Sequence, residues 1–541
     1  MVHIVCCFQV GSVTNALRDA RAVQEDYGEL TKPSTAELAR IRDNHACRDF
    51  HRKFKSVVPF DVVALPLVNK KGELVYEQHP VIAPHEMWRY LNSKGELLNR
   101  FLGEGANLRR FWAAIRESTL GGHILKGLEH CDDVDLIPLQ LHGDDAEAFK
   151  NRSYTYISWS GLAKKDCKFA HFLVCAVAKR RHYVDEHGRN QTLLKLGEFI
   201  RWSLEQLRAG VTGPRAFSGK PQQHGPLLHR GVLVTFQGDL SWFRELFCQA
   251  RHYNCIQCCF YCEAERCNGE GRDLRYWDMS ASAPWRQTCY EQPLEECFQS
   301  LLKMEGVCLS MIAVDMLHCI YIGVGEDVIG SCAMHVLRTH PISPAELWSQ
   351  HTKWCSAHGY VSRSTYQCFD IPFRRPQNRH PHVSPAKGFD ARVLILWFST
   401  LRSMFEENLG LWSAVFHLAH FIKLLDNAGI VLTPSERDKA CMALTTFLQV
   451  WSSLALTRTL IETDKTSDFK VRDKFHYLAH LERVLTVVNF RINPKLGATF
   501  SGESFVGDMA SITAVQHPNT ACLRTLQQFV LRQELYFQQL N

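Results

Sequence analysis

Two apolar runs that each end in an aspartate constrain the fold of this chain more than any other feature. The run LIPLQLHGD (136–144) ends in Asp144, and the run GVLVTFQGD (231–239) ends in Asp239. Short apolar runs bounded by turn residues are typical of buried strands. A carboxylate at the end of such a strand is exposed at the edge of the sheet. We therefore expect two carboxylates at a sheet edge, with Asp145 as a close alternative to Asp144.

The pattern around these runs predicts an α/β protein. Alternating or aromatic-rich segments favour strands, and apolar residues spaced three or four apart favour helices. The predicted order is β-β-β-α-β-α-β. Its strands are 136–144, 153–162, 169–184, 231–239 and 307–315, and its helices are 192–210 and 240–250.

The flanking regions are predicted to be mainly helical. Residues 1–130 have loosely helical spacing. From 325 to 495 the best helical patterns are 392–410, 412–429 and a segment that starts at Thr433 and runs to about 460. The last begins with Thr-Pro-Ser-Glu, a capping box with proline at the first helical position.

Composition indicates an ordinary globular protein. A chain of 541 residues with 46% apolar and 22% charged residues can form two to four structural units. The 21 cysteines do not indicate a disulfide scaffold, because a chain this long can form a core without one. We find no signal-peptide pattern and no long uncharged apolar segment, so we expect a reduced, intracellular protein with no membrane partner. The net charge of +6 permits a polyanionic partner.

A cysteine-rich loop and a histidine pair predict a metal site. The segment CIQCCFYCEAERC contains two overlapping CxxC pairs, Cys255/Cys258 and Cys259/Cys262, followed by Cys267. Two thiolates at this spacing reach one tetrahedral ion, so zinc is the expected metal. Far downstream, His476 and His480 lie four residues apart and would share one face of a helix.

Two further motifs carry titratable side chains. Asp315 and His318 directly follow the last predicted strand, in the segment DMLH. Glu503 lies in GATFSGESFVGDMASI (497–512), a helix-like stretch near the C-terminus. Its long separation from Asp239 requires an explanation.

Taken in order, these motifs resemble the DDE transposases of cut-and-paste DNA transposons, which have a ribonuclease H-like core. The set is most similar to the CACTA/Mirage/Chapaev group, including Plavaka-like and Kyakuja-like elements. In those families a strand-ending aspartate is followed by a CxxC loop, a C/D-x-x-H motif, a helical insertion, an H-x3-4-H motif and the catalytic glutamate. The resemblance covers roughly 130–515.

The resemblance implies a domain organisation. Residues 1–130 would form a mainly helical N-terminal region. Residues 131–324 would be the first part of a ribonuclease H-like mixed sheet, with the Cys-rich loop at 252–290. A large all-α insertion would span 325–495, and residues 496–541 would complete the core. The insertion would explain why Glu503 lies so far from Asp239.

The resemblance also implies the chemistry. Asp144, Asp239 and Glu503 would be catalytic and would hold Mg2+ or Mn2+ for DNA cleavage and strand transfer. Structural zinc would be held by two cysteines and two histidines; we favour Cys259, Cys262, His476 and His480, with Cys255 and Cys258 as alternatives. Asp315 and His318 would match the C/D-x-x-H motif.

The partners implied by the resemblance are DNA, as transposon ends and target, and further copies of the chain in a homo-oligomer in the nucleus. We expect DNA backbone contacts from the basic stretches 179–182 and Arg374-Arg375. Two alternatives are a domesticated, catalytically inactive nucleic-acid-binding protein and a nuclease without a mobile element, both with the same fold.

Overall fold

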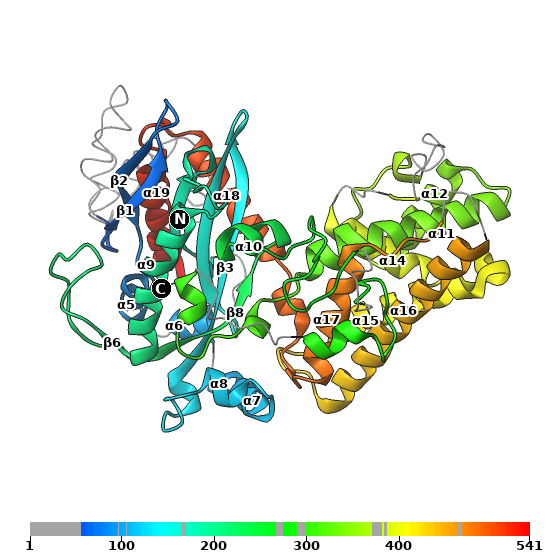
Figure 1. Cartoon of the computed structure of the whole chain (residues 1–541), viewed down its shortest axis with the longest axis horizontal. Helices are drawn as coiled ribbons and strands as arrows, with labels where there is room; N and C mark the ends of the chain where they lie inside the picture. Colours follow the sequence, from blue (N-terminus) through cyan, green and yellow to red (C-terminus); the bar gives the residue numbers. More distant parts are fainter. Residues whose placement is uncertain are drawn as a thin grey trace.

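The chain folds into a lobe built on a mixed sheet and a lobe built of helices (Figure 1). The structure is a computed structural model, and it describes residues 56–95, 97–103, 105–164, 169–266, 274–289, 299–369, 381–383, 387–461 and 468–540. The predicted positions Cys267, Arg374 and Arg375 lie outside these residues.

A four-stranded mixed sheet forms the centre of the first lobe. Its strands are β3 (Leu136–Phe149), β4 (Arg152–Gly161), β5 (Phe172–Ala178) and β8 (Arg230–Gln237), in the order β5-β4-β3-β8. Strand β4 is antiparallel to both β3 and β5, and β8 is parallel to β3. The prediction of a mixed α/β protein is confirmed.

Helices cover both faces of this sheet. An added Cβ at Gly143 would meet the Trp242 ring on α10 (Leu240–Phe247), and one at Gly502 on α18 (Phe500–Ala514) would meet the His142 ring. Because His142 and Gly143 are consecutive strand residues, their side chains point to opposite faces. Helices α10 and α18 therefore lie on opposite faces, α9 (Gln191–Ala209) beside α10 and α19 (Ala521–Leu540) beside α18.

Local side-chain and backbone features define both ends of α9. The Asn190 side chain accepts a hydrogen bond from the backbone N–H of Leu193 at the N-terminus, and Gly210 ends the helix in the left-handed conformation with φ 70°. Glycine adopts this conformation without the steric cost that a Cβ brings.

The predicted strand 307–315 was wrong as a regular strand. This segment contains a short 3-10 turn, Leu309–Met311, and pairs with β8 only at the bridge between Phe236 and Ile312. The backbone N–H of Ala313 donates to Phe236 O at 2.9 Å. The chain then leaves the sheet because the Asp315 side chain caps a helical turn, accepting from the backbone N–H of Leu317.

The region before the sheet contains a hairpin that the sequence analysis did not predict. Strands β1 (Asp61–Val68) and β2 (Leu74–Val81) are antiparallel. The end of β2 lies against β5, where the Ile82 N–H donates to Val174 O. The described part of this region also contains the helices α5 (Pro84–Asn92), α6 (Leu97–Leu102), α7 (Gly105–Glu117) and α8 (Gly121–Ile124). Residues 1–55 of the region predicted to be mainly helical lie outside the described residues.

The second lobe consists of helices, as predicted for 325–495. A π-helix, Leu317–Val324, continues into α11 (Gly325–Thr339). The remaining long helices are α12 (Pro344–Ala357), α14 (Gly388–Phe398), α15 (Leu409–Asn427), α16 (Pro434–Ile461) and α17 (Asp473–Thr486).

The start of α16 agrees with the sequence prediction, and the end of α14 does not. The capping box is present, since Thr433 Oγ1 accepts from the Glu436 N–H while the Glu436 carboxylate accepts from Thr433. The predicted helix 392–410 instead ends at Phe398, because Ser399 and Thr400 turn their hydroxyls back onto helix carbonyls and Asn408 caps a new helix.

By length and composition alone, two segments of this lobe, Leu317–Thr339 and Pro434–Thr457, are apolar enough to cross a membrane. They are weak candidates, because 78% and 50% of their most apolar windows are buried inside the protein. Core helices of globular proteins have the same properties.

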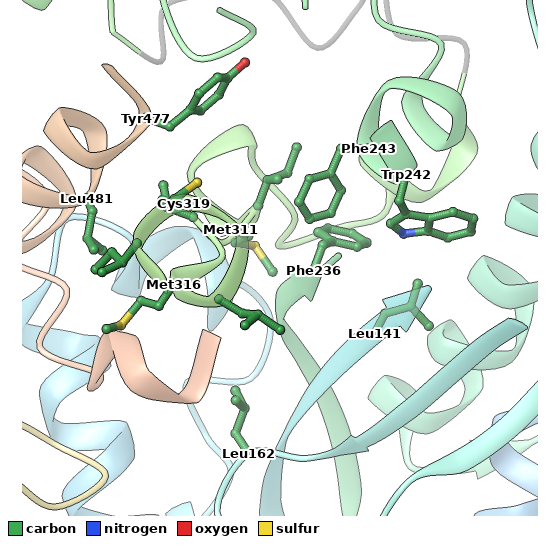
Figure 2. Packing of buried hydrophobic residues seen from close by; sticks show 14 of the residues in the cluster. Leu141, Leu162, Phe236, Trp242, Phe243, Met311, Met316, Cys319, Tyr477 and Leu481 are labelled. Carbon is green, nitrogen blue, oxygen red and sulfur yellow. The ribbon is translucent and has the colours of Figure 1, made fainter. Parts of the chain in front are cut away.

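Buried apolar side chains join the two lobes. Figure 2 shows Phe236 of β8 and Phe243 of α10 near Met311, with Cys319 on the π-helix and Tyr477 and Leu481 on α17 beyond them. These side chains are at most 5% exposed, with Leu481 the highest. The sheet, the π-helix and α17 therefore share one core, which fixes their relative positions.

Candidate functional site

Four predicted metal ligands meet where the two lobes join. Cys259, Cys262, His476 and His480 are fully buried, and their ligand atoms all lie within 4.8 Å of one another. Cys259 Sγ is 3.3 Å from His480 Nε2, and Cys262 Sγ is 3.2 Å from His476 Nε2. Tetrahedral zinc bonds of about 2.0–2.3 Å place ligand atoms about 3.3–3.8 Å apart. The group therefore has the composition and the spacing for one metal ion.

The surroundings of this group also fit a metal ion. The backbone N–H groups of Tyr261 and Ala264 point at Cys259 Sγ and Cys262 Sγ, at 3.3 and 3.4 Å. His476 Nδ1 lies 3.0 Å from the carbonyl oxygen of Tyr276, so Nδ1 carries the proton and Nε2 is free for a metal. Burial opposes ionisation of Cys259, but Cys262 and the two histidines outweigh it and hold the pKa of the Cys259 thiol well below its usual value.

The alternative ligands Cys255 and Cys258 lie outside the group. Cys255 Sγ contacts His252 Nε2 at 3.0 Å, and Cys258 Sγ points to the carbonyl oxygen of Ala264 at 3.7 Å. A cysteine that the sequence analysis missed, Cys289, does approach it, with Sγ 3.7 Å from His480 Nδ1. Cys289 is not part of a CxxC pair, so the cysteine spacing did not mark it as a candidate metal ligand.

The three predicted acids gather on one face of the sheet. Asp144 lies within β3, because the strand continues to Phe149, and not at a strand end as predicted. Asp239 directly follows β8, and its Oδ1 accepts a hydrogen bond from the Trp242 N–H at 2.6 Å. Burial and then the charges of Asp239 and Glu503 raise the pKa of the Asp144 carboxyl to about 7.

Strand geometry separates Asp144 from Asp145. Asp144 is two residues from His142, so it faces α18 and Glu503. Asp145 faces α10, where it pairs with Lys179 and accepts a hydrogen bond from the Thr155 hydroxyl. Lys179 also contacts the Glu245 carboxylate of α10 at 2.9 Å. Asp145 is therefore engaged in an ion pair on the far face of the sheet.

Glu503 is held at this face by residues from before and after the helical lobe. Its Oε1 lies 3.3 Å from His318 Nε2, and His318 Nδ1 pairs with the Asp315 carboxylate. Asp315 also accepts hydrogen bonds from the backbone N–H and hydroxyl of Thr499, at 3.0 and 2.8 Å. Gln237, at the end of β8, donates to the carbonyl oxygen of Leu496.

These contacts anchor the start of α18. Asp315, His318 and Gln237 precede the helical lobe, whereas Thr499 and Glu503 follow it. Burial lowers the pKa of His318, but Asp315 and Glu503 outweigh it, so the pKa is raised and the ring donates from both nitrogens. The sequence analysis missed Gln237 and Thr499. The only indication of them in the sequence is that each is a polar residue at the end of a strand or helix.

The acidic cluster predicts a response of stability to pH and to divalent ions. Burial, with nearby negative charge, raises the pKa of Asp144 to about 7 and also raises that of Glu503. The folded state therefore holds protons that the unfolded state releases above about pH 4, so the free energy of unfolding should fall as pH rises from about 4 to 7. We expect Asp144→Asn to raise the melting temperature at pH 8 in EDTA by a few degrees and to remove the rise that Mg2+ causes in the wild type.

The matched control is Asp145→Asn. It breaks the ion pair with Lys179 and should lower the melting temperature while the Mg2+ response persists. Thermal melts of both variants with Mg2+ and with EDTA show whether the Mg2+ response depends on Asp144 or on Asp145. Loss of the response in the Asp145 variant alone would assign the ion to the opposite face of the sheet.

The basic stretch 179–182, which the sequence analysis predicts to contact DNA, is mostly engaged within the protein. Lys179 is ion-paired as described, and Arg181 pairs with Glu77. His182 is 9% exposed and pairs with Leu67 in an isolated bridge. Only Arg180 in this stretch is exposed. Arg180 is therefore the side chain of this stretch that remains accessible to a ligand.

Comparison of the sequence with protein-family models and with curated proteins finds no match.

Proposed function

We propose that this protein is a DNA-cleaving and strand-transfer enzyme of the DDE transposase type. The observation that carries the proposal is the convergence of Asp144, Asp239 and Glu503, from three distant segments, on one face of the sheet. Burial and then the charges of Asp239 and Glu503 raise the pKa of the Asp144 carboxyl, as expected for a carboxyl group placed beside other carboxylates. Carboxylates in this arrangement suit Mg2+ or Mn2+, which favour oxygen ligands.

The fold supports the same proposal. The order β5-β4-β3-β8, with β8 parallel to an otherwise antiparallel set, is the arrangement expected of a ribonuclease H-like sheet. The segment that contains Ile312 adds one parallel bridge at the outer edge of β8, where such a fold would have its fifth strand. The helical lobe lies between this segment and α18, the place where the resemblance puts an insertion.

The protein's own residues would divide the work as follows. Asp144 and Asp239 are fixed by the sheet and by the start of α10, and Glu503 is fixed by His318 and by the anchoring of Thr499. When bound, a pair of divalent ions would activate the attacking oxygen and stabilise the leaving oxygen of the phosphodiester. His318 Nε2 lies 3.3 Å from Glu503 Oε1, and the charge of the ring partly offsets the rise in the pKa of Glu503 that burial causes.

The buried Cys2His2 group would have a structural role, with zinc as the expected metal. Two of its ligands precede the helical lobe and two lie on α17. A metal there would tie the two sides of the lobe together and support the position of the chain that leads into α18.

The direct test is cleavage of supercoiled plasmid DNA by the purified protein. We expect nicking with Mg2+ or Mn2+ and none in EDTA, followed by joining of a pre-cut 3′-hydroxyl end to target DNA. DNA binding without cleavage at any tested metal concentration would contradict the proposal and favour the non-catalytic nucleic-acid-binding protein. Cleavage without end joining would favour a nuclease.

A further inference from the structure

A groove with a volume of about 820 Å3 lies at the edge of the sheet lobe, and its lining includes neither the three acids nor the Cys2His2 group. Its walls come from three separate parts of the chain: the β1–β2 hairpin, the adjoining ends of β4 and β5, and the start of α19. Such a volume is far larger than one phosphate group, so it suits an extended ligand.

The charges that line the groove are mainly positive. Its cationic side chains are Lys70, Arg180 and Arg181, and its single carboxylate is Glu77. Arg181 and Glu77 form an ion pair with each other. Lys70 and Arg180 are exposed and have no ion-pair partner in the part of the chain that the structure describes. The groove therefore presents two uncompensated cations to a ligand.

Two neutral groups in the groove are also suited to an anion. The Tyr154 side chain lines it, is only 4% exposed, and has no hydrogen-bond partner for its hydroxyl among the described residues. The wall formed by Asn519, Thr520 and Cys522 is the N-terminus of α19, a helix of 20 residues. The first N–H groups of a helix lack intrahelical partners and carry partial positive charge, which favours phosphate oxygens.

We propose that this groove binds the phosphate backbone of a nucleic acid strand. Lys70, Arg180, the Tyr154 hydroxyl and the start of α19 would contact successive phosphates. The identity of the ligand rests on the proposed function, since an acidic catalytic centre repels a polyanion and needs cations elsewhere to hold it. Position supports this: Asp144 pairs with Tyr156 across β3 and β4, and Tyr154 is two residues further along β4 on the same face.

The test is binding of a fluorescently labelled DNA duplex by anisotropy, in EDTA and at several salt concentrations. For the double variant Lys70→Gln/Arg180→Gln we expect affinity to fall at least about tenfold at low salt. The slope of log affinity against log salt should become shallower by about two, because two phosphate contacts are lost. Tyr154→Phe removes only the hydroxyl and should weaken binding about threefold to tenfold.

The matched control is Lys220→Gln, which should change neither affinity nor slope. Lys220 is exposed and lies in the loop between β6 (Val211–Thr212) and β7 (Gly225–Pro226). Unchanged affinity and slope in the double variant would overturn the groove as a DNA site. The proposal would also be overturned if the double variant still bound DNA but no longer bound phosphatidylserine vesicles, because that result would indicate a lipid ligand. Measurement in EDTA separates this test from catalysis, because Asp239→Asn should still bind DNA through the groove even if no variant cleaves it.

Discussion

Glu503→Gln is expected to reduce metal-dependent DNA cleavage on the order of a thousand-fold or more. The amide keeps the size of the side chain and can still accept a hydrogen bond from His318 Nε2, which lies 3.3 Å from Glu503 Oε1. It removes the negative charge that a divalent ion requires. The anchoring of Thr499 by Asp315 does not involve the Glu503 side chain, so α18 should remain in place.

The measurement is the rate of plasmid nicking across a range of Mg2+ and Mn2+ concentrations. Asp508→Asn provides a matched control, because Asp508 is an exposed acid on the same helix and should leave the rate unchanged. DNA binding and the melting temperature should be close to wild type in both variants. A Glu503→Gln protein that cleaves at the wild-type rate would remove Glu503 from the catalytic set.

Loss of the Cys2His2 metal is expected to destabilise the whole molecule. Structural zinc contributes on the order of 10 kcal/mol to the folding of small zinc peptides, which is comparable to the total stability of a domain. The four ligands are fully buried, so without a metal the chain must bury two thiols and two imidazoles whose ligand atoms face one another. We expect Cys259→Ser and His476→Ala to lower the melting temperature by about 10 °C or more.

Metal analysis should find about one zinc per wild-type chain and little in either variant. Cys255→Ser is the matched control, because Cys255 lies outside the group and its loss should leave the zinc content unchanged. If the variants do not fold, a strong chelator added to the wild type should cause the same fall in melting temperature. Full zinc retention by both variants would refute the assignment of the ligands.

The strongest local patterns predicted their elements well. The apolar runs at 136 and 231 became β3 and β8, and the capping box of α16 is where the sequence placed it. Each of these features depends on neighbours within a few residues. The segment 307–315 was misassigned because its apolar side chains enter the core shared by the lobes and not a strand ladder.

Some residues of the candidate site could be predicted from the sequence, and others could not. Residue type and spacing were enough to select the four residues that the structure brings together as a group able to hold a metal ion, because few side chains bind zinc and CxxC restricts their geometry. The choice between Asp144 and Asp145 needed the structure, because adjacent strand residues point to opposite faces and the predicted strand end was five residues too early. Thr499 and Gln237 became apparent only through contacts with residues far away in the sequence.

The anchoring of α18 has a consequence for how the protein is made. The sheet strands β3, β4, β5 and β8 are complete once the first half of the chain has left the ribosome, but the helix that covers their other face begins at Phe500. During synthesis of the helical lobe, that face of the sheet and its acids remain uncovered. Such exposed apolar intermediates are prone to aggregate. A chain that stops within the helical lobe would keep the sheet strands yet have neither Glu503 nor a finished core.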